Sequence, residues 1–286
     1  GSGTNAINGS VTRNLIAGDV TAEVASLTQN VSASSLTVQA DQSSNIFSFA
    51  GVINGGGANA VGGAISVNDI AGTVTAKLGS SSLKTTGAVQ VLAHMDGDIG
   101  SVAAAGSGAG NAAVNGSNTT NSLTSSVKAI ATSVTQTTGS SSFKVWAHDD
   151  SNIESFAGTV SGGGTAAVGA ALALNFLGRT AGNESASKIV SAEVTSSSLQ
   201  VSGAVQVLAD SNSTVEALGV AAGGGGTFAV TGSNTTNILD DSIIAKWVGS
   251  TLVGGSGSLD VSATDTAVIH ALAGNFAGGG TAAVGA

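Results

Sequence analysis

The residues of this chain best suited to metal binding or acid–base chemistry are its three histidines and the carboxylates beside two of them. They occur in His94-Met-Asp96-Gly-Asp98, in His148-Asp149-Asp150 and at His270. His94 and His148 fall at the same position of a sequence repeat described below. If one repeat forms three coils of a β-helix, their imidazoles lie roughly 14 Å apart at the usual strand spacing, too far to share an ion. We therefore expect solvated surface histidines, acidic turns beside them and no metal site.

The sequence carries no recognisable catalytic or cofactor-binding motif. Asp149-Asp150 and Asp240-Asp241 are adjacent pairs, and alternation along a strand points neighbours apart, whereas glycoside hydrolases need converging carboxylates. The blocks Gly-Gly-Gly-Thr-Ala-Ala-Val-Gly-Ala lack the aspartate of calcium-binding β-roll repeats. Weak calcium binding by the acidic pairs with backbone carbonyls stays open as an alternative. We predict that the chain is not an enzyme and has no cofactor and no catalytic, cofactor-binding or metal-binding residues.

The elements that position these residues belong to a tandem repeat. A glycine-alanine block recurs six times, and its last apolar residues are separated by 54, 53, 54, 62 and 54 positions: Ile7, Val61, Val114, Val168, Val230 and Val284. Such a period specifies a stack of similar units. We predict one elongated repeat domain over 1–286, a segment of a longer array, with units at about 1–54, 55–107, 108–161, 162–223, 224–277 and 278–286.

Columns of equivalent positions indicate strands. One column is all valine, the column two residues later is all alanine, and the position before each valine is mostly polar: Val38, Val91, Val145, Val207 and Val261; Ala40, Ala93, Ala147, Ala209 and Ala263; Thr37, Gln90, Lys144, Gln206 and Asp260. Alternation with period two is typical of a half-buried strand. A polar stretch follows, as in 149–152, and then an isoleucine or valine column from Ile46 onward, which we interpret as a turn and a second strand.

We predict an all-β fold, a parallel β-helix, with three coils of 18 residues in each 54-residue unit; two coils of 27 are the alternative. Three coils per unit give about 16 coils and a rod on the order of 75 Å long. The strand after each glycine-alanine block closes with asparagine at 14, 68, 121, 175 and 237. Because asparagine tolerates left-handed backbone, this column predicts a corner.

Two irregularities overlie the repeat. The longest unit holds about eight extra residues within 176–189, which we expect to leave the rod as a loop carrying Arg179 and Glu184. Alternate units differ, with Gly-Ser-Asn-Thr-Thr-Asn at 116–121 and 232–237 but Ala-Ile-Ser-Val-Asn at 64–68 and Ala-Leu-Ala-Leu-Asn at 171–175. Duplication of a two-unit block explains this pattern; the sharper hypothesis is a patterned face that packs against a neighbour.

Composition narrows the classes of partner. The net charge is −9, and the eight basic residues are scattered, which argues against nucleic-acid binding. Mean hydropathy is +0.35, yet no stretch approaches the roughly 20 apolar residues of a membrane-spanning helix. Proline and cysteine are both absent. Backbone ladders without disulfides must therefore hold the fold.

The glycine-alanine blocks, the strand ending in asparagine and Val-Gln-Val-Leu-Ala-Asp-Ser at 205–211 resemble the repeat regions of large bacterial filamentous adhesins. These include leukotoxin-type adhesins and other β-helical proteins exported by autotransporter or two-partner routes. The resemblance covers nearly the whole chain. It implies an extracellular or cell-surface β-helical stalk that acts in adhesion, aggregation, biofilm or fibre formation.

The expected function is thus a structural and adhesive rod. Its partners would be further copies, joined end to end or laterally, a continuation of the same chain, or glycans and proteins of host or neighbouring cells. The alternative is a carbohydrate-binding or carbohydrate-cleaving β-helix, which a groove lined by carboxylates and aromatic rings from neighbouring coils would favour.

Overall fold

The computed structural model describes residues 3–182, 188–254 and 257–286. Over these ranges the chain consists of strands joined by short connections, without a helix. The part of the chain that the structure describes therefore holds no helix long and apolar enough to cross a membrane. The strands form four parallel sheets, so the predicted fold class, an all-β parallel β-helix, is confirmed.

The first sheet, sheet A, contains the long strands β3 (Leu36–Gly56), β7 (Ala88–Ala109), β11 (Ser142–Gly163), β15 (Val205–Gly225) and β19 (Leu259–Gly279). Sheet B contains β1 (Asn5–Ala17), β4 (Asn59–Ala71), β8 (Ala112–Leu123), β12 (Ala166–Leu177), β16 (Phe228–Leu239) and β20 (Ala282–Gly285). Sheet C contains β2 (Val20–Ala25), β5 (Thr73–Gly79), β9 (Ser126–Thr132), β13 (Lys188–Thr195) and β17 (Asp241–Val248). Sheet D contains β6 (Ser82–Leu83), β10 (Thr135–Gln136), β14 (Ser198–Leu199) and β18 (Thr251–Leu252).

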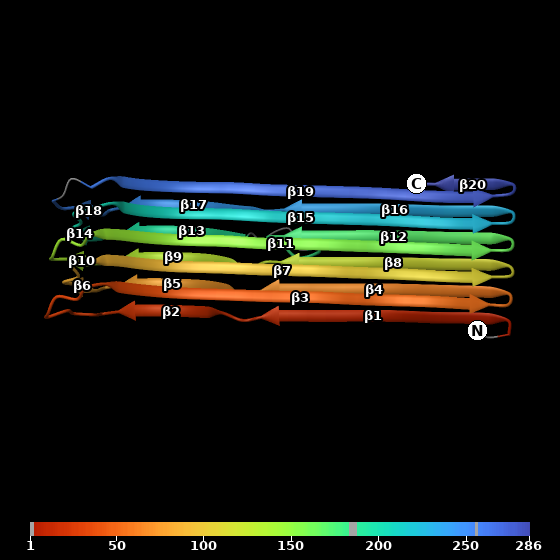
Figure 1. Ribbon diagram of the computed structural model, residues 1–286, viewed down its shortest axis with the longest axis horizontal. Helices are drawn as coiled ribbons and strands as arrows, with labels where there is room; N and C mark the ends of the chain where they lie inside the picture. Colours follow the sequence, from red (N-terminus) through yellow and green to blue (C-terminus); the bar gives the residue numbers. More distant parts are fainter. Residues whose placement is uncertain (1–2, 183–187, 255–256) are drawn as a thin grey trace.

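One coil of the solenoid uses a whole repeat unit. The chain runs out along sheet A, turns, returns along sheets B and C, and closes through sheet D (Figure 1). The register confirms this path, because Lys144 of β11 pairs with Gln90 of β7 on one side and Gln206 of β15 on the other. The prediction of three coils per unit is therefore wrong, and so is the alternative of two.

The number of coils per unit was overestimated because the polar stretch at 149–152 was predicted to be a turn. Strand β11 runs without a break through 149–152, with Asp149 and Ser151 facing inward and buried. Alternation therefore continues through the stretch, but the inward side chains are polar, which hid the strand from a search for apolar periodicity.

The proportions of the molecule change accordingly. Five stacked coils measure about 24 Å along the stacking axis, while a strand of 21 or 22 residues extends for about 70 Å across it. Figure 1 shows the resulting flat slab, with strands along its length. The predicted rod of 16 coils is wrong for this segment.

The interior divides into a thick and a thin half. Between sheet A and the opposing sheets C and D, together with the ends of the sheet B strands, large apolar side chains such as Ile70, Leu78, Phe143 and Leu199 form one continuous buried cluster. Between sheets A and B most buried apolar residues are alanines, for example Ala50, Ala103 and Ala157. Small side chains allow sheets A and B to approach closely, so the glycine-alanine blocks define the thin half.

An asparagine ladder runs through the thin half. Asn14, Asn68, Asn121, Asn175 and Asn237 form a chain in which each Nδ2 donates to the next Oδ1 at 2.8 to 2.9 Å. Asn68, Asn121 and Asn175 are at most 1% exposed and lie within strands. The predicted asparagine corner is therefore wrong: this column is an interior hydrogen-bond ladder.

The actual corners use other columns. Ser26, Ser80, Ser133, Ser196 and Gly249 adopt φ of 46° to 58° just after the strands of sheet C, a left-handed conformation that serine seldom adopts. At the opposite end each coil turns at a glycine. A Cβ on Gly57 would lie 2.3 Å from the Gly3 carbonyl oxygen, and one on Gly164 would lie 1.9 Å from that of Gly110. Only glycine lets these turns stack.

The insertion behaves as expected where it is described. It leaves the coil between β12 and β13, and both strands keep their register with β8 and β9. Arg179 lies on it, and its carbonyl oxygen accepts a hydrogen bond from Ser122 at 3.1 Å. Glu184 lies outside the described residues.

The asparagine ladder predicts a position-dependent loss of stability. Asn121→Ala removes bonds to Asn68, Asn175 and Ser101 and leaves buried polar groups unpaired, which costs about 1–3 kcal/mol each. We expect the free energy of unfolding in urea to fall by about 2–4 kcal/mol. The control, Asn118→Ala on the outward side of the same strand, is expected to change it by about 0.5 kcal/mol or less. Equal losses would contradict the ladder's role.

Candidate functional site

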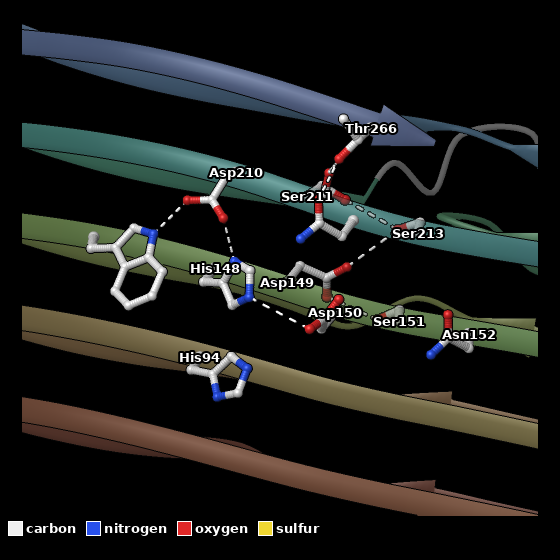
Figure 2. Close-up of polar contacts among 12 residues, drawn as sticks. His94, His148, Asp149, Asp150, Ser151, Asn152, Asp210, Ser211, Ser213 and Thr266 are labelled. Atoms are coloured by element: carbon white, nitrogen blue, oxygen red, sulfur yellow. Dashed lines mark hydrogen bonds and ion pairs between the residues drawn. The ribbon is translucent and has the colours of Figure 1, made fainter. Parts of the chain in front are cut away.

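The most elaborate polar cluster lies on the outward face of sheet A, in its thick half. One column holds Asp41, His94, His148 and Asp210, contributed by β3, β7, β11 and β15. Figure 2 shows His94 and His148 side by side on neighbouring strands. Their rings stack with centroids 5.1 Å apart. The parallel register is what brings residues 54 positions apart into contact.

His148 is the centre of this cluster. Its Nδ1 bonds to Asp210, and its Nε2 lies 3.7 Å from an Asp150 carboxylate oxygen. The Trp146 ring stacks on the imidazole at 5.0 Å between centroids, and the Trp146 indole N–H donates to the same Asp210 carboxylate. Lys144 places its ammonium 4.0 Å from the Trp146 ring centroid. The Asp210 carboxylate thus bonds to the rings of both His148 and Trp146, and the Lys144 ammonium lies against the Trp146 ring.

These contacts shift two pKa values. The hydrogen bond that His148 donates to Asp210 raises the pKa of His148, and the charges of Asp210, Asp150 and Asp149 add to this effect against the opposing influence of burial. Burial disfavours ionisation of Asp210, but hydrogen bonds from His148 and Trp146 outweigh it and lower the pKa of this carboxyl. The geometry therefore favours an imidazolium paired with a carboxylate.

Several expectations for these residues need correction. His94 and His148 are adjacent, not 14 Å apart, because a unit is one coil and not three. His148 is largely covered, with a side chain only 15% exposed, so it is not a solvated surface histidine. Asp96, Asp98, Asp149 and Asp150 lie within strands and not in acidic turns. His270 is exposed as expected and pairs with Glu216 at 2.8 Å.

A second cluster lies inside the coil, beneath the first. Asp149 and Asp150 point to opposite faces of β11, as alternation predicted, and Asp149 is fully buried. Its carboxylate contacts the Lys188 ammonium. It also accepts hydrogen bonds from Ser151 at 2.9 Å and from Ser213 at 3.4 Å (Figure 2). Lys188 is also fully buried. Removing one partner of such a pair typically costs about 3–5 kcal/mol.

Asp241 lies next to Lys188, in the neighbouring strand β17. Burial raises the pKa of this carboxyl, and the Asp265 and Asp149 charges raise it further, while Lys188 opposes them. Sequence reasoning missed this interior cluster. The signal was present, because continuing the Val145, Ala147 alternation by two residues places Asp149 inside.

Neither cluster gathers the ligands of a metal centre. Among the described residues, no three histidine, aspartate or glutamate side chains converge so as to hold a metal ion. The Asp149 carboxylate is enclosed by its partners, and Asp210 is engaged by two donors. The contacts join neighbouring strands of sheet A and, between Asp149 and Lys188, sheet A to sheet C across the coil, which suits stabilisation of the stack.

Two shallow grooves also cross the outward face of sheet A. One, of about 670 Å³, has apolar walls from β3, β7, β11 and β15, including Phe49, Ile53, Phe156 and Val160. The other, of about 650 Å³, lies beside it and combines aromatic rings with acidic groups: Phe47, Phe156, Glu154, Glu216 and His270. The glutamates are partners on adjacent strands.

Comparison of the chain with protein-family models, curated proteins and solved structures finds no match. Functional inference for this protein therefore starts from its own geometry.

The His148–Asp210 pair predicts pH-dependent stability. The folded pKa of His148 lies above its ordinary value of 6.5, so its contribution is complete below that value and is lost as pH rises through the folded pKa. We expect the unfolding free energy of Asp210→Asn to decrease less than that of the parent chain between about pH 6 and about pH 9. Asp41→Asn, beside His94, is the control and is expected to keep the parental slope. Identical slopes for all three proteins would contradict the pairing.

Proposed function

We propose that the chain is a structural and adhesive repeat segment of a filamentous bacterial protein, extracellular or displayed at the cell surface, and that it is not an enzyme. The resemblance of its repeats to filamentous adhesins motivates the proposal. Its role is mechanical: coils satisfy one another's backbone donors and acceptors, and exposed surfaces contact other copies, glycans or proteins of host or neighbouring cells. Adhesion, aggregation or fibre formation would follow.

The observation that carries this proposal is the register of the coils. Each strand of sheet A pairs over nearly its full length with the next, as in the 22 residues from Ser142 to Gly163 against Ala88 to Ala109. Such pairing continues for as long as the repeat continues. A stack of this kind gains length without needing a new core, which is what a stalk or fibre requires.

The outermost coil supports assembly at its edge. Strand β19 is paired on one side only, and its inward residues Val261 and Ile269 are 41% and 49% exposed, whereas Val207 and Val215, their partners in β15, are buried. An open, apolar, in-register edge is a template for another strand. Further coils, from the same chain or from another copy, are therefore its natural partner.

A second candidate function is carbohydrate binding, and the mixed groove is the observation that favours it. Phe47 and Phe156 offer apolar rings, and Glu154, Glu216 and His270 offer hydrogen-bonding groups beside them. Sugar-binding sites use this combination of flat apolar surface and a few polar groups. Cleavage would additionally require the two glutamates to act as a carboxylate pair across a glycosidic bond.

Beads coated with the chain test the structural proposal. We expect them to clump and to attach to cell surfaces, unlike beads coated with an unrelated β-protein. Val261→Lys places an inward charge at the open edge and is expected to reduce clumping at least about tenfold. Val268→Lys, outward on the same strand and similarly exposed at 43%, is the control. Dispersed beads that bind no cells would contradict the proposal.

The same beads distinguish carbohydrate binding from the structural and adhesive function. Binding to a glycan array that is lost in Phe47→Ala, but kept in Val31→Ala at a comparably exposed site away from the groove, would establish sugar binding. Release of reducing sugar that depends on Glu154 and Glu216 would establish cleavage and overturn the non-enzymatic proposal.

A further inference from the structure

The thin half of sheet A has an outward face built only from apolar residues and glycine. Four outward columns begin in β3 at Phe49, Gly51, Ile53 and Gly55 and continue through the partner positions of β7, β11, β15 and β19. Every residue in these columns is described, and none is polar or charged. The charged outward residues of the sheet begin at the next column, with Glu154, Glu216 and His270. We call these four columns the apolar face.

One column of the apolar face, that of Ile53, is ridged with a period of two strands. In the column of Ile53, large residues on β3, β11 and β19 (Ile53, Val160 and Phe276) alternate with small ones on β7 and β15 (Gly106 and Ala222). Ile53, Val160 and Phe276 are 93%, 64% and 72% exposed. The apolar groove of about 670 Å³ passes over β7 between the first two ridges and reaches Val220 and Ala222 of β15. Ridges recur about every 10 Å along the stack, and so do the grooves between them.

Equal spacing of ridges and grooves makes the Ile53 column complementary to itself. A two-fold axis parallel to the strands, midway between β7 and β11, would place β3 opposite the partner copy's β15 and β11 opposite its β7. Val160 of one copy would then enter the groove at Gly106 of the other copy, and Ile53 would meet Ala222 of the other copy. Sheets packed face to face interdigitate in this way at about 10 Å separation. Such a contact is isologous and closes as a dimer.

The available area suits a weak, reversible dimer of this segment. The strip from residue 49 to 55 is about 23 Å long, and four strands span about 19 Å, so two copies would bury about 900 Å² in total. Transient interfaces lie below about 1,200 Å². Each additional coil would widen the contact by a further strand spacing, so longer arrays would pair more tightly.

We propose that the apolar face is a lateral self-association surface, through which a second copy of this chain packs sheet A against sheet A with ridges in grooves. The proposal rests on the structural function proposed above and specifies how stalks would bundle. A face without charge or hydrogen-bonding side chains fits a partner of the same character. The ridges come from the alternation of large and small residues in the column of Ile53 on sheet A.

Sedimentation velocity of the 286-residue chain over about 1 to 100 μM tests the proposal. We expect a monomer–dimer equilibrium. Val160→Asp puts a charge into the ridge and is expected to raise the dimer dissociation constant at least about tenfold. Val11→Asp, comparably exposed at 70% on sheet B, is the control and is expected to dimerise as the parent does. Circular dichroism and the urea midpoint verify that both variants are folded.

A third variant distinguishes fitted packing from general stickiness. A Cβ on Gly106 would have no neighbour closer than 3.9 Å, so Gly106→Phe is tolerated by the fold but fills the groove. We expect it to weaken dimerisation at least about tenfold although it adds apolar surface. Stronger association of Gly106→Phe, equal effects of Val160→Asp and Val11→Asp, or a parent chain that stays monomeric at every concentration would each overturn the proposal.

Failure of lateral pairing can be told apart from failure of the proposed function. Beads coated with Val160→Asp would still clump through the open edge and attach to cells if the chain is an adhesive stalk, whereas Val261→Lys leaves the apolar face intact. Binding of the parent chain to liposomes of neutral phospholipid, lost in Val160→Asp without any dimer, would assign the apolar face to lipid and overturn self-association.

Discussion

Parallel pairing at an offset of one repeat unit is the constraint on which the rest of the structure depends. Because each strand lies directly beside its own repeat, every side chain has its counterparts about 4.8 Å away in the coils on either side. A residue type is acceptable in a column only if it tolerates that neighbour. Glycine fills the end turns where a Cβ would strike the next carbonyl, and asparagine fills the interior column where each amide satisfies the next.

The same constraint governs charge. Like charges stacked at the strand spacing repel, so opposite charges tend to occupy neighbouring positions of a column. Lys77 pairs with Glu23 at 2.9 Å, Lys246 lies 3.6 Å from Glu193, and His148 bonds to Asp210. Each of these pairs consists of Cα partners on adjacent strands. The histidine cluster is thus one of several opposite-charge pairs in this stack, while Glu154–Glu216 and Asp96–Asp150 are like-charge partners that face outward.

The fold class followed from the repeat, but the size of a coil did not. Period-two alternation around Val145 correctly indicated the strands of sheet A. The glycine-alanine blocks correctly indicated the strands of sheet B, which begin in these blocks. The polar inward residues Asp149 and Ser151 obscured the continuity of β11, because apolar periodicity cannot report a polar interior. The histidine contacts were lost for the same reason, since their distance depends on the number of coils per unit. Asn121 was misplaced because asparagine suits both left-handed corners and interior ladders.

Nitroxide labels at Gln90→Cys and Lys144→Cys test the central claim most directly, because the chain has no other cysteine. These residues are Cα partners on adjacent strands, so the account predicts strong spin exchange and a collapsed electron paramagnetic resonance spectrum. Labels at 90 and 206, two strands apart at about 10 Å, should couple much more weakly. A spectrum for 90 and 144 equal to the sum of the singly labelled proteins would contradict one coil per repeat.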